Sequence, residues 1–285
     1  MLSISADHPV DPLTVAASRA IRDAARALDL PYFLAGAVAR DILLTHVNGI
    51  DTGLATVDVD FGVAVADWDE FAQLKSRILE NNAFSADNKI EHRIYYHPER
   101  SAKGYPIDLI PFRGVQNSQH TIAWPPENKI IMNVIGYEEV LVAVVQVRID
   151  NTLTVPIASL PGLALLKLFA WQDRRAETPK DARDIALLFR HYHDAGNRDR
   201  IYNEELSLLE AVDFDLDLAS PRLLGKDVRQ IASIATREAA IALLDDASTT
   251  DLLLIHMAPV FKAADDNISA ARRLLEQFNI GLTQE

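Results

Sequence analysis

Two aspartates separated by one residue lie inside an apolar stretch of the chain, "ATVDVDFGVAV" at residues 55–65. Aspartate is depleted in strands, so the stretch combines a strand pattern with residues that strands rarely contain. Its period-two alternation places Asp58 and Asp60 on the face opposite to the valines. Positions two apart on a strand lie roughly 7 Å apart, which lets both carboxylates bind one small cation. We interpret the pair as a metal or substrate site; a solvent-facing edge strand is the alternative.

The same face continues with Gly62 and Ala64, and these small residues indicate room for a ligand. A third acid, Asp108, lies inside another apolar stretch, "YPIDLIPF" at residues 105–112. Hard cations such as Mg²⁺ take oxygen ligands, usually one or two carboxylates together with substrate phosphates. Three aspartates can hold two ions, the arrangement used for in-line displacement at phosphorus. We therefore expect Asp58, Asp60 and Asp108 to bind Mg²⁺, with Mn²⁺ as a possible substitute.

A glycine-containing segment, "GAVARD" at residues 36–41, precedes the aspartates at a predicted strand-to-helix junction. Glycine at such a junction lets backbone N–H groups approach an anion, and the helix dipole favours phosphate there. Gly36 and the amide of Ala37 are therefore candidate phosphate-binding groups, with Arg40 one turn further on. A glycine after a strand also serves simply as a turn, and Arg40 with Asp41 could equally form a solvated ion pair.

The elements that must position these residues follow from periodicity. In the first half of the chain we predict helices at 12–29, 37–47 and 67–82, and strands at 31–36, 55–65, 89–97 and 105–112. Short β segments follow from 129 to 157, of which "EVLVAVVQVRI" at 139–149 is the most strand-like, and "NTLTVPIA" at 151–158 is a candidate to pair with it.

From Ser159 onward the pattern becomes mostly helical. Helices are predicted at 159–175 and 178–194, with at least three more before the C-terminus. The expected class is α+β: an α/β domain with a mixed sheet at residues 1–157, followed by a helical domain at residues 158–285.

Composition excludes several classes of function. The chain has no cysteine, so thiol catalysis and thiolate metal sites are excluded. Its formal net charge is -13, which disfavours broad DNA binding because such binding depends on Lys and Arg neutralising phosphates. We find neither a secretory signal nor a run long enough to span a membrane, so a cytoplasmic protein without membrane contact is expected.

Glycine and a small residue at a strand–helix turn, then Asp-x-Asp, then a third strand aspartate together resemble the polymerase-β-like nucleotidyltransferase superfamily. "GAVARD" is similar to the Gly-Gly-x-x-Arg-Asp segment of CCA-adding enzymes and poly(A) polymerases. The resemblance covers the N-terminal half and implies a two-ion centre that transfers NMP from an NTP to an acceptor. Ala37 departs from the serine or second glycine usual there, so only its backbone N–H is left to contact phosphate.

The C-terminal half is similar to the abortive-infection and toxin–antitoxin nucleotidyltransferases. Lys167 and Arg174 lie seven residues apart on one predicted helix, and "KDARD" at 180–184 opens the next. The resemblance implies that Lys167 and Arg174 contact the triphosphate and that Asp184 assists catalysis. Snorkelling by Lys167 and an ordinary charged first helical turn are the alternatives.

The expected function is therefore Mg²⁺-dependent nucleotidyl transfer to an acceptor hydroxyl. The toxin likeness implies an RNA 3′ end as acceptor, foremost tRNA, and a cognate antitoxin as partner. The acidic composition leaves a protein side chain or a small molecule open as acceptor. A non-catalytic nucleotide-binding regulatory module, or a structural partner-binding protein, is the alternative of another class.

Overall fold

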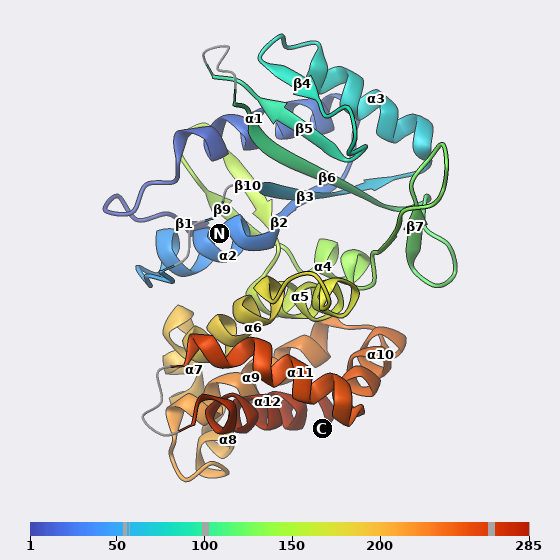
Figure 1. The fold of residues 1–285 in the computed structure, drawn as a ribbon. Coiled ribbons are helices and arrows are strands. Elements are labelled where there is room, and N and C mark those ends of the chain that lie inside the picture. The colour runs from blue at the N-terminus through green and yellow to red at the C-terminus, as the bar shows by residue number, and fades with distance from the viewer. Residues whose placement is uncertain (54–55, 57, 99–102, 262–265, 285) are drawn as a thin grey trace. The chain divides into compact units, whose positions relative to one another are not determined.

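The computed structural model describes residues 1–285 except 54–55, 57, 99–102, 262–265 and 285 (Figure 1). The chain divides into two compact units, Met1–Ser159 and Leu160–Glu285. The described part of the first unit is a mixed sheet with helices, and that of the second is helical, which confirms the predicted α+β class. No helix in the described ranges is both long and apolar enough to cross a membrane.

The main sheet of the first unit has the strand order β1-β9-β10-β2-β3-β6-β5-β4 in the described part of the chain. Its strands are β1 Leu2–Ser3, β2 Tyr32–Ala35, β3 Val59–Val65, β4 Phe84–Ala86, β5 Arg93–Tyr96, β6 Tyr105–Arg113, β9 Val145–Arg148 and β10 Thr154–Ile157. Near its centre β3 runs parallel to β6 and antiparallel to β2. Two further strands, β7 Thr121–Ala123 and β8 Ile131–Asn133, form a separate antiparallel pair.

Helices lie against both faces of this sheet. On one face are α1 Pro12–Ala27 and α3 Trp68–Leu79, which contact each other (Figure 1). Each begins at an aspartate whose carboxylate accepts backbone N–H groups of the first turn, Asp11 for α1 and Asp67 for α3. Against the other face lie α4 Tyr137–Val142 and α2 Gly36–Asp41, which continues as a π-helical segment at Ile42–Val47.

The strand predicted at 139–149 is partly wrong. Its first part belongs to α4, and only the residues of β9 are extended. The helix begins after Gly136, which has a φ of 87°, and its Tyr137 ring packs 5.8 Å from Phe33 and 5.6 Å from Phe112. A short apolar run fits helix and strand equally well by periodicity. The packing of Tyr137 against Phe33 and Phe112 favours the helix in this segment. β10 does pair antiparallel with β9, as expected.

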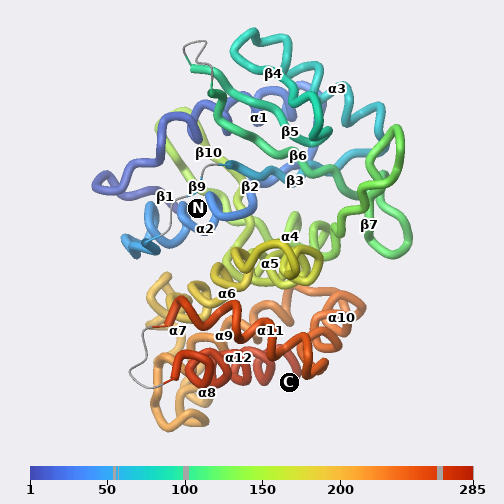
Figure 2. Tube along the Cα trace, in the orientation of Figure 1, coloured from blue at the N-terminus to red at the C-terminus, as the bar shows by residue number. Residues whose placement is uncertain are grey.

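The second unit is built from helix pairs (Figure 2). Its helices are α5 Leu160–Arg174, α6 Lys180–His191, α7 Arg198–Asn203, α8 Leu206–Glu210, α9 Leu216–Ile231, α10 Ile234–Asp245, α11 Ala247–Met257 and α12 Asn267–Thr283, with short turns at His193–Asn197 and Ala258–Val260. Glycines allow α9 and α12 to approach closely: a Cβ added to Gly225 would lie 2.1 Å from the carbonyl oxygen of Phe278. The pair α5 and α6 carries the charged residues singled out in the sequence.

Candidate active site

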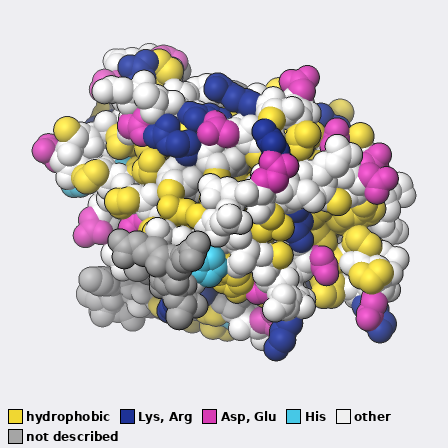
Figure 3. All heavy atoms as spheres, turned by 90° about the horizontal axis from the view of Figure 1, so that it is seen from above, with side chains coloured by type: hydrophobic (Ala, Val, Ile, Leu, Met, Phe, Trp, Pro, Cys, Tyr) yellow, Lys and Arg dark blue, Asp and Glu magenta, His cyan; other side chains and the backbone are white. Residues whose placement is uncertain are grey.

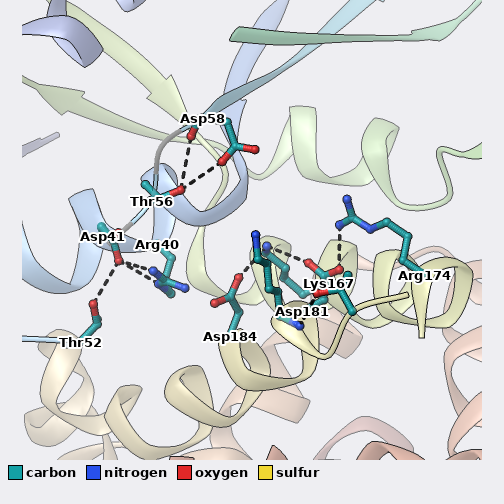
Figure 4. A network of polar contacts seen from close by, with 11 residues as sticks. Arg40, Asp41, Thr52, Thr56, Asp58, Lys167, Arg174, Asp181 and Asp184 are labelled. Atoms are coloured by element: carbon teal, nitrogen blue, oxygen red, sulfur yellow. Dashed lines mark hydrogen bonds and ion pairs between the residues drawn. The ribbon is translucent and has the colours of Figure 1, made fainter. Parts of the chain in front are cut away.

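Asp60 and Asp108 lie side by side on neighbouring strands. They are register partners in the parallel pair β3–β6 and therefore point to the same face of the sheet. Neighbouring strands lie about 4.8 Å apart, so the two carboxylates are close enough to share a ligand. Asp58 directly precedes β3, and its Oδ1 accepts a hydrogen bond from Thr56 Oγ1 at 3.2 Å (Figure 4). The described strand begins at Val59; Ala55 and Val57 of the predicted strand lie outside the described residues.

Gly36 allows the Asp60 carboxylate to lie against the strand–helix turn. Ala35 is the register partner of Asp60 across β2 and β3, so the turn begins beside that carboxylate. A Cβ added to Gly36 would lie 1.8 Å from Asp60 Oδ2, and the residue has a φ of +70°. Both the contact and the left-handed backbone require glycine here. The structure thus brings the candidate phosphate-binding turn, including Ala37 at the start of α2, next to a candidate metal ligand.

Arg93 is a site residue that the sequence reasoning missed. It is the register partner of Asp108 across β5 and β6, and its guanidinium binds both carboxylate oxygens: Nε to Oδ1 and Nη2 to Oδ2, each at 2.7 Å. These hydrogen bonds raise the pKa of Arg93, so the guanidinium stays charged. The alternation of Arg93, Tyr95 and His97 in the sequence puts all three on one face of their strand, but only the pairing of β5 with β6 shows that this face carries Asp108.

The acids fit a divalent cation in part. Within the described ranges, no group of three or more histidines and acids is arranged as a ready metal site. Asp58 and Asp60 supply oxygen ligands beside the turn at Gly36, which is the chemistry that Mg²⁺ prefers. Each oxygen of Asp108 accepts one hydrogen bond from Arg93 and keeps a second lone pair with which it can contact a cation.

The expectation of ligand space beyond the aspartates is wrong. A Cβ added to Gly62 would lie 2.7 Å from Cζ of Phe33, so that ring already fills the space above the glycine. Ala64 is buried on the same face. The small residues make room for core packing of Phe33 against Phe112 and Tyr137 rather than for a ligand.

Arg40, predicted to bind nucleotide, is a buried side chain. Its Nε and Nη2 donate to Oδ1 of Asp41 at 2.9 and 2.6 Å, and Thr52 Oγ1 donates to the same oxygen at 3.3 Å (Figure 4). The solvated ion pair considered as its alternative is thus a buried pair. A nucleotide-binding role for Arg40 remains a prediction.

The second unit brings together the charged residues predicted on α5 and α6. Lys167 Nζ lies 2.9 Å from Asp181 Oδ1 and 2.6 Å from Asp184 Oδ2, and Arg174 Nη2 lies 2.7 Å from Asp181 Oδ2 (Figure 4). The seven-residue spacing places both cations on one face of α5, as predicted. Because each cation is engaged with an aspartate, a triphosphate would have to compete for it.

The charge state of this cluster follows from its contacts. Burial alone would raise the pKa of Asp181, but Lys167 and Arg174 outweigh burial and lower it. Asp181 is therefore ionised at neutral pH. The Lys167 side chain is 12% exposed and that of Arg174 is 52% exposed, so Arg174 is the cation more open to solvent.

A model of the family described as "Nucleotidyl transferase AbiEii toxin, Type IV TA system" matches residues 55–254. The match covers both units and most of the chain, so the chain belongs to this family and the protein is a nucleotidyltransferase. The predicted resemblance is confirmed. No curated protein matches the chain.

Solved structures with a similar fold have low sequence identity. An antigenic nucleotidyltransferase-like protein from Paracoccidioides brasiliensis is 16% identical, covering 73% of this chain and 93% of its own, with a TM-score of 0.41. The antibiotic-resistance factor ANT(2'')-Ia is 12% identical, covering 72% and 98%, with a TM-score of 0.36. A CCA-adding enzyme of Thermotoga maritima complexed with tRNA is 14% identical, covering 97% and 82%, with a TM-score of 0.27.

Proposed function

We propose, from its membership of the AbiEii nucleotidyltransferase toxin family, that this protein transfers NMP from an NTP to an acceptor hydroxyl in an Mg²⁺-dependent reaction. The observation that carries the proposal is the register pairing of Asp60 with Asp108, with the Asp60 carboxylate seated against Gly36. This arrangement puts cation ligands and a phosphate-binding turn at one point of the sheet.

Asp58 and Asp60 would hold the divalent cations, with Asp108 as a further ligand beside Arg93. When bound, Mg²⁺ or Mn²⁺ lowers the pKa of the acceptor hydroxyl and stabilises the charge of the triphosphate. Two ions are expected, because in-line displacement uses one for each of the attacking and leaving oxygens.

The chain's own groups would orient the reactants. The amides of Gly36 and Ala37 at the start of α2 would donate to the phosphates. The acceptor oxygen forms a bond to the α-phosphorus while the bond to the bridging oxygen breaks and pyrophosphate leaves. The hydroxyl proton passes to a carboxylate of the Asp58, Asp60 and Asp108 cluster.

Further roles are proposed from the family resemblance. Lys167 and Arg174 would contact the triphosphate, Asp184 would assist catalysis, and Arg40 would support the nucleotide-binding turn. The ion pairs of Lys167 with Asp181 and Asp184 keep its ammonium in a fixed place, which supports a positioning role.

As acceptor we propose an RNA 3′ end, with tRNA as the first to test and a cognate antitoxin as partner, because the family consists of toxins of toxin–antitoxin systems. On the face shown in Figure 3, basic and acidic side chains are interspersed rather than gathered by sign. An acceptor strand on such a protein is better held at a local site than on a broad basic surface.

Incubation with each α-³²P-labelled NTP, Mg²⁺ and total tRNA tests the proposal, with an Asp58→Asn/Asp60→Asn variant as control. We expect label on tRNA from the unmodified protein and none from the variant. Label on a protein or small molecule would keep the chemistry and replace the acceptor. Absence of label on any acceptor, and of a thermal shift with Mg²⁺ and NTP, would favour a non-catalytic nucleotide-binding module.

A further inference from the structure

A cavity of about 950 Å³ lies within the first unit. Its walls come from the start of α1, from α2 with its π-helical continuation, and from β5 and the start of β6. Polar and aromatic residues of its lining include Thr56, Arg93, Tyr95, His97, Lys103 and Tyr105. The volume lies in the range of small-molecule and cofactor sites, about 300–1,000 Å³, so it is large enough for a nucleotide.

Two wall residues connect the cavity directly to the carboxylates. Arg93 lines it and binds both oxygens of Asp108, and Thr56 lines it and donates to Asp58. An occupant of the cavity is therefore one side chain away from the acids proposed to activate the acceptor hydroxyl. A second substrate, the acceptor, has to bind at such a position for its hydroxyl to reach these acids.

The lining matches a group that is both flat and anionic. Tyr95 supplies an aromatic ring on the same sheet face as Arg93, and Arg93 and Lys103 supply positive charge. Tyr105 also lines the cavity, but it is the register partner of Tyr96 on the other face, and its hydroxyl is hydrogen-bonded to Thr14 at 2.8 Å. Asp11 and Asp41 also line the cavity, but the Asp11 carboxylate accepts from the amide of Leu13 at 2.7 Å and the Asp41 carboxylate accepts from Arg40 at 2.6 Å. Aromatic rings that stack on bases, together with Arg or Lys that bind phosphate, are how proteins hold single-stranded RNA ends.

Arg93 can serve both neighbours. A planar guanidinium binds carboxylate and phosphate with the same two-pronged geometry, so it can exchange the Asp108 oxygens for a phosphate of the acceptor. Such an exchange would leave Asp108 with more lone pairs to offer a cation. Binding in the cavity and binding of the cation would then be linked through Arg93.

We infer that this cavity is the acceptor subsite and takes the 3′-terminal nucleotide of an RNA strand, with its hydroxyl beside Asp58 and Asp108. The inference rests on the proposed function and adds where the acceptor binds and what recognises it. Tyr95 would stack on the terminal base and Arg93 would contact the adjoining phosphate.

Fluorescence anisotropy with a fluorescein-labelled 12-nucleotide single-stranded RNA ending in CCA tests this inference. We expect Tyr95→Ala to weaken binding about tenfold, the loss of one base stacking on an aromatic ring, and Tyr95→Phe to retain it. Tyr96→Ala is the matched control, because Tyr96 follows on the same strand but faces the other side and packs 5.0 Å from Phe84. It should bind within twofold of the unmodified protein.

A second measurement does not depend on how the variants fold. An RNA carrying 4-thiouridine at its 3′ terminus should crosslink on irradiation to a peptide containing Tyr95 or Tyr105 of the unmodified protein. A crosslink only outside the cavity lining, or equal RNA affinity of Tyr95→Ala and Tyr96→Ala, would overturn the inference.

The labelling assay, combined with RNA binding, separates this inference from the proposed function. If Tyr95→Ala binds RNA normally while Asp58→Asn/Asp60→Asn abolishes labelling, the acceptor site is elsewhere and nucleotidyl transfer stands. If the unmodified protein labels a protein and does not bind the RNA, the RNA subsite is refuted and the transfer chemistry stands.

Discussion

Asp60 in the sheet and the carboxylates of the helical unit lie in different surroundings, whereas Asp108 in the sheet is bound by Arg93. Asp181 and Asp227 each lie between helices and are bound by cations: Lys167 and Arg174 for Asp181, Arg200 for Asp227. The Asp60 side chain lies against Gly36. Only glycine fits at position 36, because its backbone is left-handed and a Cβ there would meet the Asp60 carboxylate. The ion pair of Asp227 with Arg200 is explained by helix packing alone. A carboxylate that requires a left-handed glycine beside it is better explained by a ligand.

The contrast is sharpest for Asp227, which the sequence reasoning did not single out. Arg200 binds both of its oxygens at 2.6 Å, and the buried Tyr192 hydroxyl donates to Oδ2 at 2.5 Å. Burial and Asp227 raise the pKa of Tyr192, so the phenol stays protonated. Tyrosine, arginine and aspartate side chains also occur together in catalytic sites. Here they connect the C-terminal end of α6 with α7 and α9.

The comparison predicts the largest effect on activity from the sheet acids. Asp58→Asn/Asp60→Asn removes two cation ligands and should reduce transfer at least about 10³-fold, since several kcal/mol of charge stabilisation are lost and each 1.36 kcal/mol is tenfold. The melting temperature should change little, because neither side chain belongs to the apolar core. Single-turnover labelling and thermal melts measure both. If the variant lost activity only in proportion to its unfolded fraction, Asp58 and Asp60 would contribute to stability and not to cation binding.

Asp227→Asn should show the reverse pattern. The substitution removes the negative charge that binds Arg200 and leaves Glu205, at 3.7 Å, as its remaining acidic partner, which costs about 1–3 kcal/mol of unfolding free energy. Activity measured well below the melting temperature should be normal. Urea unfolding monitored by circular dichroism gives the free energy. A catalytic defect in the folded variant would place this network in the mechanism.

Gly36→Ala and Gly53→Ala form a matched pair. Both glycines have a positive φ, +70° and +64°, but a Cβ at Gly53 meets nothing within 4 Å, whereas a Cβ at Gly36 would meet Asp60. Gly53→Ala should cost only the backbone strain, about 1–2 kcal/mol of stability. Gly36→Ala should add a displaced Asp60 and about a 10²-fold loss of transfer, measured at equal folded fraction. Equal activity of the two variants would show that transfer does not depend on the position of the Asp60 carboxylate.

The smallest expected effect is a pH dependence within the helical unit. Trp171 Nε1 donates to Nδ1 of His256 at 3.0 Å, and burial, with a contribution from Arg183, lowers the pKa of His256. Because the folded pKa lies below the unfolded value of about 6.5, the unfolded state binds the proton more tightly. The stability contribution is therefore complete above pH 6.5 and is lost as the pH falls through the folded pKa.

The change should be about 1 kcal/mol, the net value of one hydrogen bond. Urea unfolding at pH 7.5 and 5.5 measures it, with His256→Asn as control because its amide oxygen accepts from Trp171 without titrating. The decrease in stability at pH 5.5 should be smaller in the variant. An equal decrease in both proteins would assign it to other groups.

Much of the fold and part of the site were predictable from the sequence. Period-two alternation found the strands that carry Asp60 and Asp108, and helical spacing put Lys167 and Arg174 on one face. Arg93 was not predictable, because its contact with Asp108 depends on the register of β5 against β6. Register is set by the three-dimensional pairing of strands, which one sequence does not display.

Two errors have a common cause. Gly62 was interpreted as space for a ligand and the run before β9 as a strand, but in both places an aromatic ring from elsewhere in the chain decides. Phe33 fills the space over Gly62, and Tyr137 holds its own segment as a helix against Phe33 and Phe112. Local patterns cannot reveal which distant ring will occupy a face.

A Mn²⁺ titration followed by electron paramagnetic resonance tests the central claim, that the sheet acids and not the helical acids hold the catalytic cations. The unmodified protein should bind Mn²⁺ in the presence of a non-hydrolysable NTP analogue. Asp58→Asn/Asp60→Asn should lose this binding. Asp181→Asn and the unmodified protein should bind Mn²⁺ equally when both are measured without nucleotide. Retained binding by the double variant, or loss of binding in Asp181→Asn alone, would contradict the assignment.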